Sequence, residues 1–185
     1  MRQAVDLPRA YVLLNHGPTV LVSSAHGAHR NVMAAAWNMP LDFSPPKVAV
    51  VIDKSTYTRE LVEASGEFVL NVPCVAIAAQ TTLVGNRSGR DADKFAASGL
   101  QASAASRVSA PLVEGCIAWL ECKVLPEPDM ARKYDLFLGE VVAAWADARV
   151  FSGNRWHFDD PSLRTLHHVA GGNYLTPGDT VRTAT

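Results

Sequence analysis

Two short segments of the chain concentrate side chains that could bind an anion. The first, Asp53 to Glu60 (DKSTYTRE), contains Lys54, Ser55, Thr56, Thr58 and Arg59. Unpaired N–H groups and the helix dipole at a helix start, helped by hydroxyl and cationic side chains, hold phosphate monoesters. An ordinary helix start capped by Ser or Thr has the same residue types. From the residues alone, both interpretations stay open.

The second segment is a polar, glycine-bearing loop, Gly85 to Lys94 (GNRSGRDADK). It adds Arg87, Ser88, Arg90 and Lys94. Such a loop is either an anion cradle or a merely solvated connection. Two elements of this kind in one chain favour a ligand that carries a phosphate.

Motifs of several common enzyme classes are missing. The sequence has no G-x-S-x-G elbow, no G-x-G-x-x-G after a strand, no Walker loop and no H-E-x-x-H. If the chain is an enzyme, we therefore expect a bound cofactor to carry the reaction.

Histidine and cysteine spacing predicts no metal centre. His26 and His29 are separated by two residues, and His167 and His168 are adjacent, so a strand or loop would not direct either pair at one ion. The 3 cysteines include no C-x-x-C pair, which suits a reducing compartment better than a disulfide framework. We expect exposed or hydrogen-bonded histidines, and cysteines that act as small buried side chains.

Short β-branched segments bounded by Gly, Pro or Asp predict strands at residues 19–24, 48–52 and 68–72. Longer strands are predicted at 116–125 and 136–145. In segment 116–125 one face carries Ala118, Leu120, Cys122 and Val124, and the other carries Glu121 and Lys123. This alternation is typical of a half-buried antiparallel strand.

Two helices are predicted. The first runs from a cap at Ser55 or Thr56 to Gly66, with Tyr57, Leu61 and Ala64 on its buried face. The second runs from Pro73 towards Val84. Because strands dominate and helices do not alternate with them, we expect an antiparallel, closed or nearly closed barrel with helices packed outside.

Chain length and charge limit the classes of protein to which the chain can belong. A chain of 185 residues suits one domain, 1–185, and no apolar run is long enough to cross a bilayer. The first residues do not have the pattern of a secretory signal, so we expect a cytoplasmic protein. The net charge is -1, and basic and acidic residues are interspersed along the chain. The sequence therefore predicts no basic surface of the kind that binds nucleic acid.

Several segments, in the same order, resemble the flavin reductase-like, FMN-binding split-barrel proteins, the group that includes flavoredoxins. They are GP-TVLVSS, NVMAAAW, PP-VAVVI, DKSTYTREL, GEFVLNVP, VGNRSGRDADKF, APL, LECKV and FLGEVV. The resemblance covers about Tyr11 to about Tyr174. It implies a mainly β, antiparallel, Greek-key-like split β-barrel that forms a homodimer, with flavin at the subunit interface.

The resemblance also implies where FMN would lie. The isoalloxazine ring would lie along the strand and turn formed by Met33, Ala34, Ala35, Ala36 and Trp37. The phosphate and ribityl chain would lie near Asp53, Lys54, Ser55, Thr58, Ser88, Gly89, Arg90 and Lys94. Many relatives have Thr or Ser at the positions of Ala35 and Ala36, so backbone groups would replace those side chains here. His167, His168 and residues 171–174 resemble a C-terminal segment that approaches the flavin or the partner subunit.

As a member of this family, the chain would be an FMN-dependent oxidoreductase that moves hydride from NAD(P)H to flavin N5 and then reduces a small molecule or a protein. Two alternatives stay open: an FMN-holding electron carrier with a protein donor, and a flavin-free binding module. Many flavin reductases of the family have Gly-Asp-His where this chain has Tyr134-Asp135 without the His. The identity of the electron donor is therefore left open.

Overall fold

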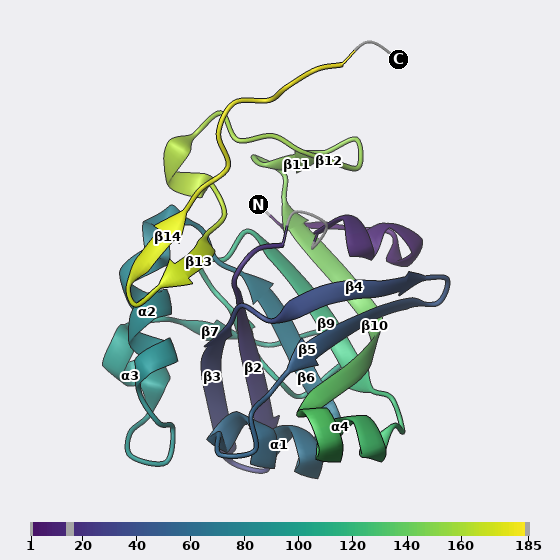
Figure 1. Cartoon of the computed structure of the whole chain (residues 1–185), viewed down its shortest axis with the longest axis vertical. Coiled ribbons are helices and arrows are strands. Elements are labelled where there is room, and N and C mark those ends of the chain that lie inside the picture. The colour runs from purple at the N-terminus through teal and green to yellow at the C-terminus, as the bar shows by residue number, and fades with distance from the viewer. Residues whose placement is uncertain (1, 14–16, 184–185) are drawn as a thin grey trace.

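The centre of the molecule is an antiparallel sheet of eight strands, as found within residues 2–13 and 17–183, which the computed structural model describes (Figure 1). The strands of this sheet are β1 (Arg2–Ala4), β2 (Val20–His26), β3 (His29–Ala35), β4 (Asn38–Phe43), β5 (Pro46–Val51), β6 (Glu67–Val72), β9 (Ala118–Val124) and β10 (Leu136–Asp147). The predicted strands are confirmed, and the strand β3 coincides with most of the NVMAAAW segment.

Strand order forces this sheet to curl. The order is β3-β2-β6-β9-β10-β5-β4, with β1 added on β10, so β3 and β4 occupy opposite ends. Yet only residues 36–37 separate β3 from β4 in the chain. The two ends must therefore meet at Ala36 and Trp37, where the backbone N–H of Val51 donates to the carbonyl of Trp37 at 3.0 Å. No ladder joins β3 to β4 in the described residues, so the barrel is split at this seam.

The remaining elements surround the barrel. They are the helices α1 (Tyr57–Ser65), α2 (Ala78–Asn86), α3 (Lys94–Ser98) and α4 (Pro128–Tyr134), the 3-10 turns η1 (Leu7–Leu13), η2 (Val75–Ile77) and η3 (Pro161–Leu163), and the strand pairs β7–β8 (Ala102–Ser103, Leu112–Val113), β11–β12 (Phe151–Ser152, Arg155–Trp156) and β13–β14 (His167–Ala170, Asn173–Leu175). Helices α1, α2 and α3 all pack against β3. No helix in the described part of the chain is both apolar enough and long enough to traverse a lipid bilayer.

Helix α1 begins and ends as its sequence predicts. The Thr56 hydroxyl accepts the N–H of Arg59, and Gly66 closes the helix with a φ of 69°. The buried face differs from the prediction, because Tyr57 is only half-buried and Ala64 is exposed. The helix packs against β2 and β3, and its buried residues are Thr58, Arg59, Leu61 and Val62.

The second predicted helix starts later than Pro73. Residues 74–75 instead pair with the C-terminal segment, since Cys74 forms a β-bridge with Thr165 and the N–H of Val75 donates to the Arg164 carbonyl at 3.0 Å. The pairing holds Cys74 in an extended conformation, with φ of -125° and ψ of 175°, so no helix can run through it. A 3-10 turn then leads into α2 at Ala78.

Both faces of β9 are buried, whereas the sequence predicted a half-buried strand. Leu120 and Cys122 face the barrel interior as expected, and Lys123 is exposed. Glu121, on the outer face, is 0% exposed because the segment 102–113 covers it. Its carboxylate accepts the N–H groups of Ser106 (3.0 Å) and Arg107 (2.6 Å), the Ser106 hydroxyl and the Trp145 indole N–H at 3.0 Å.

All three cysteines are free and buried, as expected of small apolar side chains. Burial raises the pKa of the Cys74, Cys116 and Cys122 thiols. These thiols are therefore protonated structural groups at neutral pH.

Candidate cofactor site

A pocket of about 400 Å³ opens at the seam of the barrel. One wall is the end of β3 and the following turn, and the facing wall is α2. A third side is closed by the hairpin β13–β14, which lies beside α2 in Figure 1. The lining residues are Thr19, Met33, Ala34, Ala35, Ala36, Trp37, Val51, Asp53, Thr81, Thr82, Gly85, Asn86, His168, Gly171 and Tyr174.

Small residues line the part of this pocket where β3 and α2 meet. Helix α2 approaches β3 so closely that a Cβ added at Gly85 would lie 3.2 Å from the Cβ of Ala34. The strand and the helix are therefore in contact at this point, and a flat, rigid ligand would lie in the slot beside this contact. All five residues predicted to contact the ring, Met33 to Trp37, line the slot.

The hairpin β13–β14 is fixed over the slot by side-chain contacts. The Tyr174 and Thr82 hydroxyls are 3.0 Å apart, and the N–H of His168 donates to the Thr19 hydroxyl at 3.0 Å. The His168 and Tyr174 rings meet edge to face. His168 thus lines the pocket, whereas His167 is half-buried beside Thr165, and burial lowers the pKa of His167.

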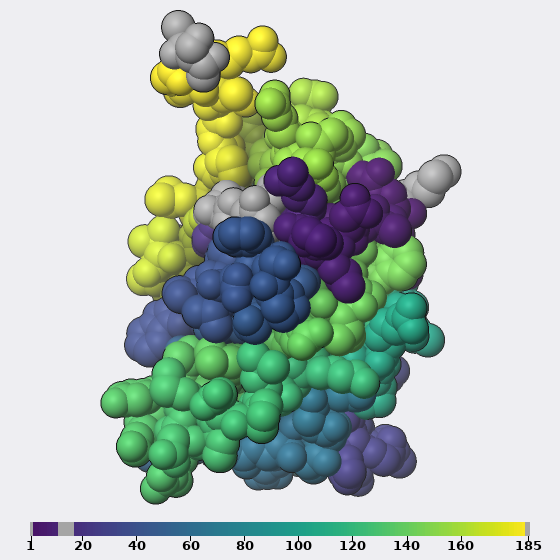
Figure 2. All heavy atoms as spheres, turned by 90° about the vertical axis from the view of Figure 1, so that its right-hand side faces the viewer, coloured from purple at the N-terminus to yellow at the C-terminus, as the bar shows by residue number. Residues whose placement is uncertain are grey.

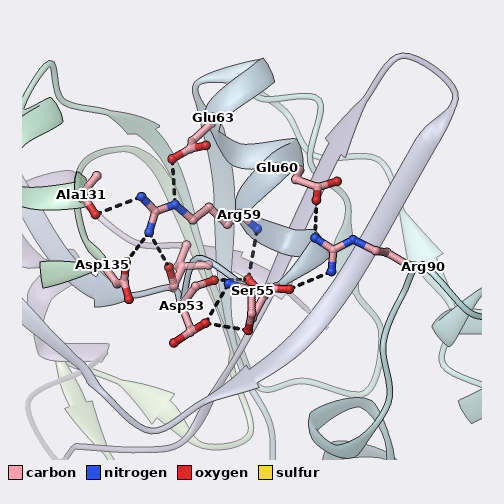
Figure 3. A network of polar contacts seen from close by, with 10 residues as sticks. Asp53, Ser55, Arg59, Glu60, Glu63, Arg90, Ala131 and Asp135 are labelled. Carbon is pink, nitrogen blue, oxygen red and sulfur yellow. Dashed lines mark hydrogen bonds and ion pairs between the residues drawn. The ribbon is translucent and has the colours of Figure 1, made fainter. Parts of the chain in front are cut away.

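The pocket leads to the two predicted phosphate elements. It ends at Asp53 and Asn86, which are close in sequence to Lys54 and Ser55 on one side and to Ser88 on the other. Arg90 joins the two elements, because its guanidinium donates to the Ser55 carbonyl at 2.7 Å and pairs with Glu60 (Figure 3). The fold therefore brings residues 53–60 and 85–94 together beside one end of the slot.

The predicted phosphate residues have different surroundings. Lys54 and Ser55 are exposed, while the Thr58 side chain is buried and accepts a hydrogen bond from Asn31 Nδ2 at 2.8 Å. The hydroxyl and the N–H of Ser55 donate to the Asp53 carboxylate, which lowers the pKa of Asp53. Asp53 therefore acts as an anion that shapes the turn before α1 (Figure 3).

Lys94 is buried, like Thr58. It is 5% exposed, and its ammonium donates to the carbonyl of Val84 near the end of α2 at 2.8 Å. Burial lowers the pKa of Lys94 to about 8. Its side chain holds the start of α3 against α2, below the loop that carries Ser88 to Arg90.

The sequence comparison agrees with this geometry. Residues 14–163 match the family described as the flavin reductase like domain. The chain belongs to the flavin reductase-like family. Uncharacterized protein YddH of Escherichia coli K12 is 50% identical over 180 residues, which are 96% of this chain and 95% of that protein.

Two solved flavin reductase-like structures have the same fold. The FMN-binding domain of a flavin reductases-like enzyme from Shewanella baltica OS155 is 48% identical, with a TM-score of 0.96 over 100% of this chain and 98% of that one. Flavoredoxin of Desulfovibrio vulgaris (Miyazaki F) is 26% identical, with a TM-score of 0.79 over 91% of this chain and 90% of that one. The mainly β, FMN-binding split-barrel fold predicted from the sequence is confirmed.

The Asp that this chain shares with the family Gly-Asp-His triplet has a structural role. Asp135, which lies where many flavin reductases have Gly-Asp-His, closes α4 with a φ of 55° and accepts a hydrogen bond from Arg59 at 2.5 Å. Arg59 also pairs with Glu63 at 2.7 Å and donates to the Ala131 carbonyl at 3.0 Å (Figure 3). Arg59 therefore ties α1 to α4 and is not directed at the slot.

Several site residues could not be found from the sequence. Thr19, Thr82 and Asn86 reach the flavin reductase-like pocket from elements distant in the chain. His26 and His29, which their spacing predicted to point apart, are instead register partners across the β2–β3 hairpin. In the described residues, however, no three His, Cys, Asp or Glu side chains gather in a way suited to a metal ion.

Proposed function

We propose that this chain binds FMN and works as an oxidoreductase that transfers hydride from NAD(P)H to flavin N5. The main support for the proposal is that two neighbouring parts of the molecule form one continuous site. A narrow slot of small residues at Ala34 and Gly85 leads to a crevice with hydroxyl and cationic groups at Ser55 and Arg90. FMN has the same two parts, a flat ring and a phosphate on a flexible chain.

The residues around the ring would act mainly by shape. Ala34, Ala35 and Ala36 leave the β3 backbone accessible to the ring, and Met33 and Trp37 lie at the two ends of this stretch. Thr82 and Tyr174 hold the hairpin over the slot, which limits access of water. Bound FMN supplies the redox chemistry, so close stacking and orientation are the main requirements placed on the protein.

The phosphate would lie between the start of α1 and the loop 85–94. Lys54 and Ser55 contribute from the turn before α1, which Asp53 shapes, and Thr58 contributes from the first turn of α1. Ser88, Gly89 and Arg90 contribute from the loop, and Lys94 supports it by fixing the end of α2. Charge-assisted hydrogen bonds of this kind are strong, particularly with a doubly charged phosphate.

A second function is electron carriage, with FMN reduced by a partner protein rather than by a nicotinamide. The absence of the His of the family Gly-Asp-His triplet after Asp135 favours it. Flavoredoxin, with 26% identity, is also a neighbour of this fold. In both functions, the final electron acceptor is either a small molecule or a protein.

Visible spectra separate these functions. Purified protein saturated with FMN is expected to show the flavin bands and to lose them when NADH or NADPH is added without oxygen. Bleaching only with dithionite would identify the electron carrier. A protein that stays colourless with added FMN would be the flavin-free binding module and would contradict the proposal.

We further propose a homodimer that covers an apolar groove beside the slot. Trp37 and Phe43 are 75% and 65% exposed, and Met39 and Leu41 are exposed near them. A groove of about 380 Å³ runs from Trp37 and Met39 to Met130 and Leu138. Figure 2 shows this face, with the β4–β5 hairpin in blue against the green segment that contains α4. Exposed apolar surface of this size is typical of an interface.

Because Ala36 and Trp37 line both the slot and the groove, a second copy would lie next to each flavin. Analytical ultracentrifugation is expected to give twice the chain mass of 19.9 kDa. Met39→Glu with Phe43→Glu is expected to give the monomer, because two carboxylates cannot be buried unpaired. A monomeric wild type at micromolar concentration would refute the dimer.

A further inference from the structure

The tip of the β2–β3 hairpin carries two exposed histidines that the proposed function does not use. His26 ends β2, His29 begins β3, and the two are register partners. Only Gly27 and Ala28 separate them, and Gly27 has the positive φ, 58°, that a tight two-residue turn needs. Partners in an antiparallel pair direct their side chains to the same face, with Cβ atoms about 4.5–5.5 Å apart. The two imidazoles therefore stand side by side.

The hairpin gives this histidine pair a rigid support. The β2–β3 ladder continues to its last pair, His26 and His29, without a register shift, and β2 also pairs with β6. Two residues along the same face of β3, Asn31 Nδ2 donates to Thr58 Oγ1 of α1 at 2.8 Å and so ties the hairpin to the helix. Ligands that are held in place by a sheet lose little conformational freedom when they bind.

The cationic residue next to the pair is directed away from it. Arg30 follows His29 and therefore points to the opposite face of β3. On that face its guanidinium lies 4.7 Å from the centroid of the Phe95 ring and 3.8 Å from the Asp93 carboxylate. Arg30 thus does not place its charge beside the two imidazoles. Both imidazoles are open to solvent, which can supply further ligands to a bound ion.

We infer that His26 and His29 together bind one divalent transition-metal ion, with water molecules as its other ligands. Imidazole nitrogen suits Cu²⁺, Ni²⁺ and Zn²⁺, and it lies about 2.0–2.1 Å from a bound Zn²⁺. Two rings on adjacent strands can both reach one ion at such distances. Cu²⁺ is expected to bind most tightly, because it forms the most stable complexes with nitrogen ligands. The site is at the opposite end of β3 from Ala35, and so is separate from the slot.

Calorimetric titration of the oxidised protein, freed of excess flavin, with copper(II) chloride at neutral pH tests the inference. The wild type is expected to bind one Cu²⁺ at micromolar concentration. His26→Gln and His29→Gln are each expected to weaken this binding at least about tenfold, because each variant keeps a single imidazole. His157→Gln is the matched control, since His157 lies outside the hairpin with its Nε2 3.0 Å from the Ser152 hydroxyl. It is expected to leave Cu²⁺ affinity unchanged.

Electron paramagnetic resonance of the Cu²⁺-loaded protein reports the ligands directly. The wild type is expected to show two imidazole nitrogens bound to the ion, and each single variant is expected to show one. Circular dichroism checks that the variants keep the fold. A loss of affinity in only one of the two variants would identify a lone surface histidine and overturn the inference. Equal Cu²⁺ binding by the wild type and by the variant that lacks both histidines would overturn it as well.

Discussion

Lys54→Glu combined with Arg90→Glu is expected to weaken FMN binding by roughly 100-fold or more, as measured by calorimetry or fluorescence. Lys54 is exposed just before α1, and Arg90 reaches from the loop to the carbonyl of the next residue, Ser55. Two carboxylates there would face a phosphate with two negative charges. The carboxylate introduced at position 90 would also repel Glu60, the present partner of Arg90, and so open the crevice.

Two comparisons make this result specific to the phosphate. Riboflavin affinity is expected to stay close to that of the wild type, because the slot itself is unchanged. Arg155→Glu with Arg182→Glu makes the same change in net charge at exposed positions in β12 and the C-terminal tail, away from α1 in Figure 1. Unchanged FMN affinity in the Lys54 and Arg90 variant would show that the phosphate lies elsewhere.

The second large effect concerns stability. Glu121→Ala is expected to lower the free energy of unfolding by about 3 kcal/mol, or the melting temperature by roughly 6–12 °C. The substitution removes the acceptor for the N–H groups of Ser106 and Arg107 and for the Trp145 indole, and leaves these donors without a partner under the segment 102–113. Chemical denaturation measures the loss in free energy of unfolding, and thermal melting measures the change in melting temperature.

Glu67→Ala is the matched control. The Glu67 carboxylate binds the same segment through the N–H and hydroxyl of Ser109, at 2.7 Å each, but it is partly exposed. Water can replace its hydrogen bonds, so the expected loss is at most about 1 kcal/mol. Equal losses in the free energy of unfolding for the two variants would mean that the burial of Glu121 adds nothing to the strength of its hydrogen bonds.

Local patterns explain what the sequence predicted well. The positions of β9 and β10, the Thr56 cap and the Gly66 end of α1 depend on neighbouring residues only, and each is present in the structure. The antiparallel split barrel followed from the dominance of strands and from the order of segments that resemble the flavin reductase-like family. The five ring residues likewise line the pocket as a continuous stretch.

Long-range contacts explain what could not be predicted. Glu121 is buried because a segment that precedes β9 folds back over it, and α2 starts late because Cys74 pairs with Thr165. Neither contact has a local signal. Lys94 carries the right charge for a phosphate loop, but its direction is set by the carbonyl of Val84.

Strand β3 ends the sheet order, so in the described residues only β2 pairs with it. The main-chain N–H and C=O groups along its other side have no neighbouring strand, which is normally a liability of a sheet edge. Around Ala34 and Ala35 these groups border the slot. A ligand that docks there would be bound by main-chain groups, as a neighbouring strand would be. Such recognition does not depend on the side chains of β3, so these side chains can change in related proteins without loss of the binding surface.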